Sequence, residues 1–371
     1  MSEAQVLAPA AEERVAVASN WTLVWWRFRK HYLALASVFV LGCLYLVVLC
    51  TDFFSTQNPE LTDARQAFIP VQPLHFFDRD RFSPWVPEIV GRRNPLTLRM
   101  EWTQDPNRKV PVQFFAPGAS YRVLGLFETK VHLLGSADAG RRIFLLGSDR
   151  LGRDQWSRIM HGTQTSMTVG LVAVALSVVL GVVLGGISGY FGGLADQVIQ
   201  RLIELLQSVP TIPIWLALSA ALPRDWTPTQ VFFAITVILS VVGWTTLGRE
   251  VRGRFLALRE EDFVLAAKLA GCSQLRIILR HMVPTFLSHI IATSSLAIPV
   301  MIISETSLSF LGLGIRPPAI SWGVLLQEAQ NIQTLALAPW LLIPGLVVIV
   351  AVLAFNLVGD GLRDASDPYS R

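Results

Sequence analysis

The sequence predicts an all-α membrane protein with six transmembrane helices and a small β-rich insert outside the membrane, between the first and second helices. Of the 371 residues, 52% are hydrophobic and only 16% are charged, against about 25% charged in an average soluble protein. The mean hydropathy is +0.48. Several uncharged stretches reach the roughly 20 residues that span a bilayer. This composition excludes a disordered chain, a coiled coil and a basic nucleic-acid-binding domain, and three Cys exclude a disulfide scaffold.

The uncharged apolar stretches predict six membrane spans. They are residues 32–51, a stretch within 162–195, and residues 205–223, 226–248, 282–304 and 337–359. The first follows a tail, residues 1–31, and has no signal-peptide cleavage site after it, so we expect it to be retained. An even number of spans places both ends of the chain on one side, including the C-terminal tail 360–371.

The distribution of basic residues predicts which side that is. Seven Lys or Arg lie between Arg249 and Arg280, and four more precede the first span. The short loops on the opposite side hold only Arg224 and Arg316. Because basic residues stay in cytoplasmic loops, we expect both termini in the cytoplasm and residues 52–160 outside. The net charge of +4 then reflects orientation in the membrane and gives no reason to expect a nucleic-acid partner.

The second span contains Gly181, Gly185 and Gly189 at four-residue spacing. Small residues at this spacing let two helix backbones approach closely in lipid. We therefore predict tight helix packing along this face, or, as the alternative, a broken helix beside a transport pathway.

The external insert, residues 52–160, has nine Pro between Pro59 and Pro117. Apolar and polar residues alternate from 96 to 103, which predicts a half-buried strand. Residues 104–107 read as a turn, so 109–115 are expected to return as the partner strand. Shorter strands are expected at 121–126, 130–134 and 143–146. The insert is either a docking or lid surface for an external partner, or a decorated loop packed on the helix ends.

The most informative loop, residues 249–283, joins the fourth and fifth spans. Glu260, Glu261 and Asp262 suit the first turn of a helix. Phe263, Ala266, Ala267 and Ala270 form one helical face, Gly271 ends the helix, and Ser273 can cap a second one. These features predict a helix-turn-helix lying at the membrane surface.

This loop resembles the EAA loop of permease subunits in bacterial ABC importers. That pattern is Glu-Ala-Ala, three residues, Gly, nine residues, Ile, one residue, Leu, Pro. Ala266, Ala267, Gly271 and Pro284 match it at the right spacing. The chain departs from the pattern with Leu265 for the Glu, His281 for the Ile and Val283 for the Leu. The thirteen-residue interval from Gly271 to Pro284 makes the match specific, and the missing Glu removes one polar contact.

Three further segments resemble the second-subunit type of dipeptide and oligopeptide permeases. They are Leu146–Asp154 with Ser157, Arg158, His161 and Gly162; Glu305–Gly314 with Ser321–Gly323; and Gly359–Asp364 with Asp367 and Pro368. The likeness covers the first span and roughly residues 144–371. It implies the type I ABC importer permease fold, with residues 161–359 as a five-helix core after the first span.

The resemblance also implies how such a chain works. It would be a multi-pass subunit of the bacterial inner membrane that forms, with a homologous permease as a heterodimer, a path for peptides. Two ATP-binding subunits would drive it, and an external substrate-binding protein would deliver the solute. ATP and Mg would be bound by those subunits, so no cofactor is expected in this chain. The implied coupling residues are Leu265, Ala266, Ala267, Lys268, Gly271, Ser273, Arg276 and Pro284.

Other functions remain as alternatives. The same machine could import oligosaccharides, nickel or another small solute, or the chain could be an ion-coupled carrier that needs no ATPase. A membrane-bound enzyme lacks support, because no phosphate-binding Gly-x-x-x-x-Gly-Lys, zinc His-Glu-x-x-His or Gly-x-Ser-x-Gly motif occurs. His161, His281 and His289 are expected to be structural or interfacial. Glu204, Glu305 and Asp360 lie near span ends, where water or Arg can reach them, and are functional candidates or structural pairs.

Overall fold

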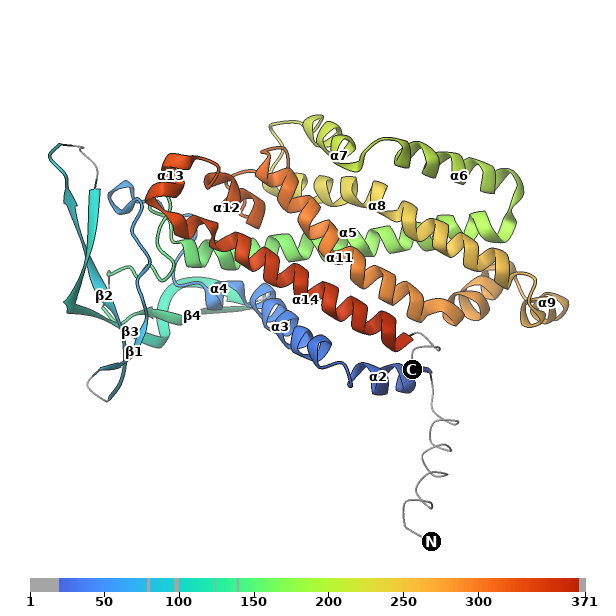
Figure 1. Cartoon of the computed structure of the whole chain (residues 1–371), viewed down its shortest axis with the longest axis horizontal. Coiled ribbons are helices and arrows are strands. Elements are labelled where there is room, and N and C mark those ends of the chain that lie inside the picture. The colour runs from blue at the N-terminus through green and yellow to red at the C-terminus, as the bar shows by residue number, and fades with distance from the viewer. Residues whose placement is uncertain (1–19, 79–80, 97–99, 124, 139, 367–371) are drawn as a thin grey trace, which may run out of the picture.

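A computed structural model describes residues 20–78, 81–96, 100–123, 125–138 and 140–366. The molecule is elongated, with a bundle of long helices and an antiparallel sheet beyond one end of the bundle (Figure 1). A short helix, α9 (Asp262–Leu269), projects at the other end. Among the described residues, the largest buried apolar cluster of the bundle lies between α5, α7, α8 and α11.

The N-terminal helices are α2 (Asn20–Phe28), α3 (Tyr32–Leu49) and α4 (Thr51–Phe54). The sheet follows, with β1 (His75–Asp78), β2 (Arg81–Arg93), β3 (Met100–Val123) and β4 (Phe127–Ser136). The rest of the chain is helical: α5 (Gln155–Phe191), α6 (Gly193–Ser208), α7 (Thr211–Ala220), α8 (Pro228–Leu258), α9, α10 (Gln274–Arg276), α11 (Leu287–Phe310), α12 (Trp322–Glu328), α13 (Ile332–Leu337) and α14 (Ile343–Ser366).

Five of the six predicted spans fall on helices that are long and apolar enough to cross a membrane. They are α3, α5, α8, the stretch 274–310 that ends in α11, and the stretch 339–366 that ends in α14. The third prediction, a single helical span over 205–223, is wrong, because no single helix covers these residues. The chain there is a pair of helices, α6 and α7, bent by 89°, because Pro210 follows an extended residue, Val209, between them.

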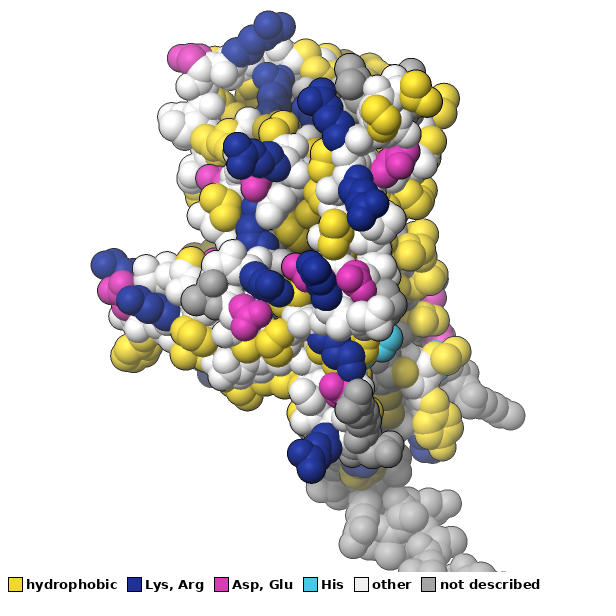
Figure 2. Space-filling model, turned by 90° about the vertical axis from the view of Figure 1, so that its left-hand side faces the viewer, with side chains coloured by type: hydrophobic (Ala, Val, Ile, Leu, Met, Phe, Trp, Pro, Cys, Tyr) yellow, Lys and Arg dark blue, Asp and Glu magenta, His cyan; other side chains and the backbone are white. Residues whose placement is uncertain are grey.

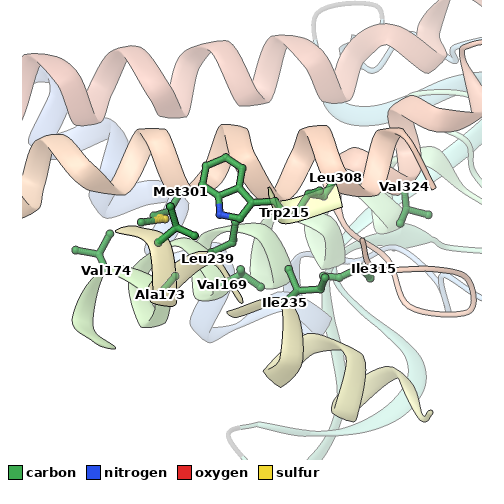
Figure 3. Packing of buried hydrophobic residues seen from close by; sticks show 11 residues of the cluster. Val169, Ala173, Val174, Trp215, Ile235, Leu239, Met301, Leu308, Ile315 and Val324 are labelled. Carbon is green, nitrogen blue, oxygen red and sulfur yellow. The ribbon is translucent and has the colours of Figure 1, made fainter. Parts of the chain in front are cut away.

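The bent pair is held to the bundle by the indole of Trp215. Figure 3 shows this side chain of α7 among Met301 and Leu308 of α11 and Leu239 of α8. Only 8% of Trp215 is exposed. Burying an aromatic side chain of this size contributes on the order of 2–3 kcal/mol, so the short α7 is fixed by packing and does not depend on its own length for stability.

The glycine face of the second span packs against α8, as its spacing predicts. A Cβ added at Gly189 would lie 2.6 Å from the carbonyl oxygen of Arg252. A Cβ at Gly185 would overlap the carbonyl oxygen of Gly248. The two backbones therefore touch, and the expected close helix packing is confirmed.

Replacing Gly185 with Leu should force α5 and α8 apart and destabilise the bundle by about 1–3 kcal/mol, the usual range for overpacking. The matched control is Gly42→Leu on α3, where an added Cβ meets no atom within 4 Å. Thermal unfolding of the detergent-solubilised protein should show a lower midpoint for Gly185→Leu than for Gly42→Leu. Equal midpoints would show that the helix contact is not tight.

The insert forms one four-stranded antiparallel meander in the order β1-β2-β3-β4. The turn predicted at 104–107 is wrong, because β3 runs through it to Val123. There the ladder shifts register: Pro87 pairs with Lys109, and the next residue, Glu88, pairs with Asp105. The turn-like residues make a bulge in a long strand, and the partner of residues 100–103 is β2.

Two other strand predictions are corrected as well. Residues 121–123 are the end of β3, and 143–146 form no strand. Residues 130–134 do lie in a strand, β4. The sheet is fixed to the bundle by an apolar cluster that includes Val86, Val112 and Leu134, with Trp156 of α5 packed against it. On the end face formed by the insert, Lys and Arg are interspersed with Asp and Glu and with hydrophobic side chains (Figure 2).

Candidate functional site

The loop at the far end of the bundle from the sheet is a helix-turn-helix, as its sequence predicts. Its first helix, α9, begins after Glu261, which occupies the N-cap position without a side-chain cap bond. Asp262 lies in the first turn, where the helix dipole favours a negative charge. The loop therefore begins with the polarity expected from its three acidic residues.

The inward face of α9 consists of Val264 and Ala267. Val264 is fully buried, and both pack in a cluster with Phe255, Ile277 and Met282. The predicted face is only partly right, because Phe263 and Ala266 are exposed. Residues three apart lie on one side of a helix, and here the larger Val264 rather than the small Ala residues decides which side faces the protein.

Gly271 ends α9 in a left-handed conformation, with φ of +75°. Its N–H donates to the carbonyl oxygen of Lys268 at 3.0 Å, and the N–H of Cys272 donates to that of Ala267 at 3.1 Å. A residue with a Cβ is strained in this conformation. A Cβ built here meets no atom within 4 Å, so the chain itself leaves the outer side of the turn open.

The second half of the loop leads directly into α11. Ser273 accepts a hydrogen bond from the N–H of Arg276 at 3.4 Å and caps α10. A π-helical turn over 277–282 and a 3₁₀ turn over 283–286 follow. Pro284 lies in the 3₁₀ turn, where its missing N–H suits the irregular backbone.

Five large apolar side chains are exposed on the outer surface of the loop, among charged residues such as Asp262, Arg276 and Arg280. We call these five side chains the apolar tip; they are Phe263, Leu265, Leu269, Leu275 and Leu279. Leu269 is 90% exposed and Leu275 is 66% exposed. Sequence reasoning missed three of the five: Leu269, Leu275 and Leu279. The spacing of these residues could have predicted the exposed surface, because Leu265 and Leu269, like Leu275 and Leu279, are four residues apart and lie away from the buried face. An exposed apolar cluster of this kind marks a surface that meets another molecule.

The remaining predicted coupling residues surround this tip. Ala266, Ser273, Arg276 and Pro284 are exposed. Lys268 turns back toward the bundle, with Nζ 5.7 Å from the centre of the Tyr190 ring. The structure therefore places seven of the eight predicted residues on or beside an open surface and buries one, Ala267.

At the opposite end, the segment before α5 holds a buried ionic network. The guanidinium of Arg158, 1% exposed, donates to Asp149 and lies 3.1 Å from Glu328. Arg153 contacts the same two carboxylates, at 2.6 Å and 2.7 Å. The network joins the start of α5 to α12. Sequence reasoning named Asp149, Arg153 and Arg158 but missed Glu328.

The three acidic candidates near the span ends lie in different surroundings. Glu305 is fully buried. Ser166 and Ser309 donate to its carboxyl oxygens at 2.8 Å and 2.7 Å, and no Arg among the described residues lies within ion-pair distance of it. Glu204 is exposed and pairs with Arg201 at 2.7 Å. Asp360 is exposed.

The three histidines lie apart, as expected. His161 contacts Asp52 at 3.3 Å beside the sheet, and His289 contacts Glu250 at 3.3 Å between α8 and α11. The hydrogen bond from His161 lowers the pKa of Asp52, against the raising effect of partial burial. Over the described residues, no group of three His, Cys, Asp or Glu is arranged to hold a metal ion.

Comparison with known proteins agrees with this arrangement. Residues 181–371 match the family described as "Binding-protein-dependent transport system inner membrane component". Residues 19–72 match the "N-terminal TM domain of oligopeptide transport permease C". The four strands of the insert lie between the two matched ranges.

The "Oligopeptide transport system permease protein OppC" of Escherichia coli K12 is 40% identical over 66% of this chain and 78% of its own length. Proteins of the same name from Bacillus subtilis and Mycobacterium tuberculosis H37Rv are 35% and 37% identical over 61% of this chain, and over 72% and 76% of theirs.

Among solved structures, an inward-facing MetNI methionine ABC transporter chain matches with a TM-score of 0.42. It is 17% identical and covers 57% of this chain and 97% of its own. The family match, which includes the whole helix-turn-helix loop, confirms the resemblance predicted from that loop. The chain therefore belongs to the binding-protein-dependent transport system inner membrane components, a family of multi-pass membrane permease subunits.

Proposed function

We propose that this chain is a permease subunit of an ATP-driven importer and forms, with a homologous permease, the path for oligopeptides. Relatives that are 35–40% identical to it over 61–66% of its length carry the name of oligopeptide permeases. An external binding protein would deliver the peptide at the end of the molecule that carries the sheet. ATP and Mg would bind to two partner subunits, since this chain has no phosphate-binding Gly-Lys motif.

The observation that carries the proposal is the apolar tip. Five large apolar side chains are exposed on a helix-turn-helix whose inner face packs against α8 and α11, at the end of the bundle away from the sheet. In a family of subunits that work with others, a projecting apolar surface on a fixed base suits contact with an ATP-binding subunit. Movement of that subunit would then be passed through Val264 and Ala267 to α8 and α11, which pack in the same cluster.

The proposed topology has six spans, counting α6 and α7 as one broken span, with both termini in the cytoplasm. Seven basic residues between Arg249 and Arg280 support the cytoplasmic side for the loop. The end of α2, the start of α3 and the end of α14 lie together, because Phe28, Ala34 and Ala365 form one cluster. The chain thus enters and leaves the bundle on one side.

The proposal is tested by affinity purification of the tagged chain from its native host in mild detergent. We expect two ATP-binding subunits and one different permease subunit to copurify with each tagged chain. Thermal-shift screening of the binding protein against tripeptides, oligosaccharides and Ni²⁺ should show stabilisation by peptides. Purification without an ATPase would contradict the proposal and favour an ion-coupled carrier. Stabilisation of the binding protein by an oligosaccharide or by Ni²⁺ alone would show that the importer carries that solute and not peptides.

A further inference from the structure

The helix α6 divides lengthwise into a polar half and an apolar half. At 100° per residue its polar side chains fall on one continuous arc and its apolar side chains on the other. The polar side chains are Asp196, Gln197, Gln200, Arg201, Glu204, Gln207 and Ser208, and the larger apolar ones are Leu194, Val198, Ile199, Leu202, Ile203, Leu205 and Leu206. Such a helix normally lies at a boundary between apolar and aqueous surroundings.

The structure fixes which edge of α6 faces the bundle. Ile203 is fully buried, and the carboxylate of Asp196 accepts two hydrogen bonds from Arg252 of α8, at 2.6 Å and 2.7 Å. Farther along, Gln207 donates to Thr245 of α8 at 3.1 Å. These contacts run in opposite directions along the two helices, so α6 lies antiparallel beside the half of α8 that leads to α9 (Figure 1).

Two different surfaces remain open on α6. One is apolar, with Leu194, Val198, Leu202 and Leu205 exposed. The other we call the polar strip; it consists of Gln197, Arg201, Glu204 and Ser208, all exposed. A shallow groove of about 520 Å³ runs beside Arg201 and Glu204.

The polar strip has little connection with the rest of the chain. Arg201 and Glu204 pair with each other at 2.7 Å, and in the described part of the chain no charge on another helix lies within ion-pair distance of either. Such an exposed pair stabilises a protein by only about 0–1 kcal/mol. Exposing the Arg201–Glu204 pair to lipid would cost free energy, because charged side chains in a membrane are tolerated only next to water, to each other or to polar partners.

We propose that the polar strip lines the inner half of the translocation path and that Arg201 and Glu204 contact the charged ends of the passing peptide. This rests on the proposed function. The apolar surface of α6 would face lipid or the second permease, while the strip faces water. Arg201 would bind the terminal carboxylate with its planar guanidinium, and Glu204 would accept hydrogen bonds from the terminal ammonium, one terminus at a time.

The position of the strip is tested by cysteine labelling of the reconstituted complex, with Cys43, Cys50 and Cys272 replaced by Ser. Gln197→Cys and Ser208→Cys should react with a charged, membrane-impermeant thiol reagent at least tenfold faster than Val198→Cys and Leu202→Cys. The reason is that the thiolate forms only where water reaches the sulfur. Similar rates on the two surfaces would overturn the placement.

The role of the charge pair is tested by Arg201→Gln and Glu204→Gln, with Leu202→Gln as the matched control on the same helix. In proteoliposomes supplied with the binding protein and trialanine, each charge variant should take up about tenfold less peptide per ATP hydrolysed. Complex assembly and ATPase rate should stay at the level of the control. Unchanged uptake per ATP would overturn the inference, and so would loss of assembly, which would make the strip a subunit contact.

Import by the unmodified complex and labelling of α6 distinguish the proposed function from the role of the polar strip. If the unmodified complex imports no trialanine with ATP, the proposed function fails whatever the labelling shows. If the unmodified complex imports trialanine but the polar strip labels no faster than the apolar surface, only the inference about α6 fails.

Discussion

Replacing Leu269 with Glu should abolish ATP-driven uptake while leaving the subunit folded and inserted in the membrane. Leu269 is 90% exposed, so the substitution removes almost no contact within the chain. In the complex the same side chain would be covered by the ATP-binding subunit. Burying an unpaired carboxylate there costs several kcal/mol, and each 1.4 kcal/mol weakens binding tenfold. We therefore expect at least a thirtyfold loss of affinity for the ATPase.

The measurement is copurification of the ATP-binding subunits, together with peptide uptake. Leu96→Glu is the matched control, because Leu96 is 92% exposed in the connection between β2 and β3, at the other end of the molecule. The control should keep its ATPase subunits. If Leu269→Glu also retains full ATPase binding and uptake, the apolar tip is not the contact surface.

Replacing Arg158 with Ala should have the largest effect on stability. The guanidinium is buried between the carboxylates of Asp149 and Glu328, and Asp149 has no exposed surface. Removing one partner of a buried ion pair leaves a charge without compensation, which costs about 3–5 kcal/mol. Arg153 still contacts Asp149 at 2.6 Å, so the lower end of this range is expected.

Thermal unfolding in detergent measures this effect. The matched control is Arg108→Ala, since Arg108 is 68% exposed and lies 3.9 Å from Glu88, a surface pair worth at most about 1 kcal/mol. A shift in unfolding midpoint no larger than that of the control would contradict the network's structural role. Arg158→Lys should recover only part of the loss, because an ammonium lacks the planar fork of donors.

Long apolar stretches were predictable from the sequence because length and the absence of charge suffice to identify a span. That rule succeeded for α3, α5, α8, α11 and α14. The rule missed α6, because Arg201 and Glu204 interrupt its apolar residues and the sequence from 193 to 204 is therefore not an uncharged stretch. The rule uses the average hydropathy of a stretch, so it does not recognise a helix such as α6 that is apolar on one side only.

The helix-turn-helix was predictable because its signals are local. Gly271 ends α9 through its left-handed backbone conformation, and Ser273 caps α10. Each residue lies next to the helix end that it determines. The partner of Arg158 was not predictable: Glu328 is 170 residues away, and only tertiary packing brings them together. The bulge in β3 was missed for a similar reason, because residues 104–107 alone favour a turn and β2 overrides it.

The central claim is that this chain passes the energy of ATP hydrolysis to peptide movement. It is tested most directly in proteoliposomes that contain the complete complex, with ATP at the cytoplasmic face and the binding protein with labelled trialanine at the other. We predict accumulation of peptide that requires both ATP and the binding protein and is lost in Leu269→Glu. Accumulation driven by an ion gradient without ATP, or unchanged in Leu269→Glu, would contradict the account.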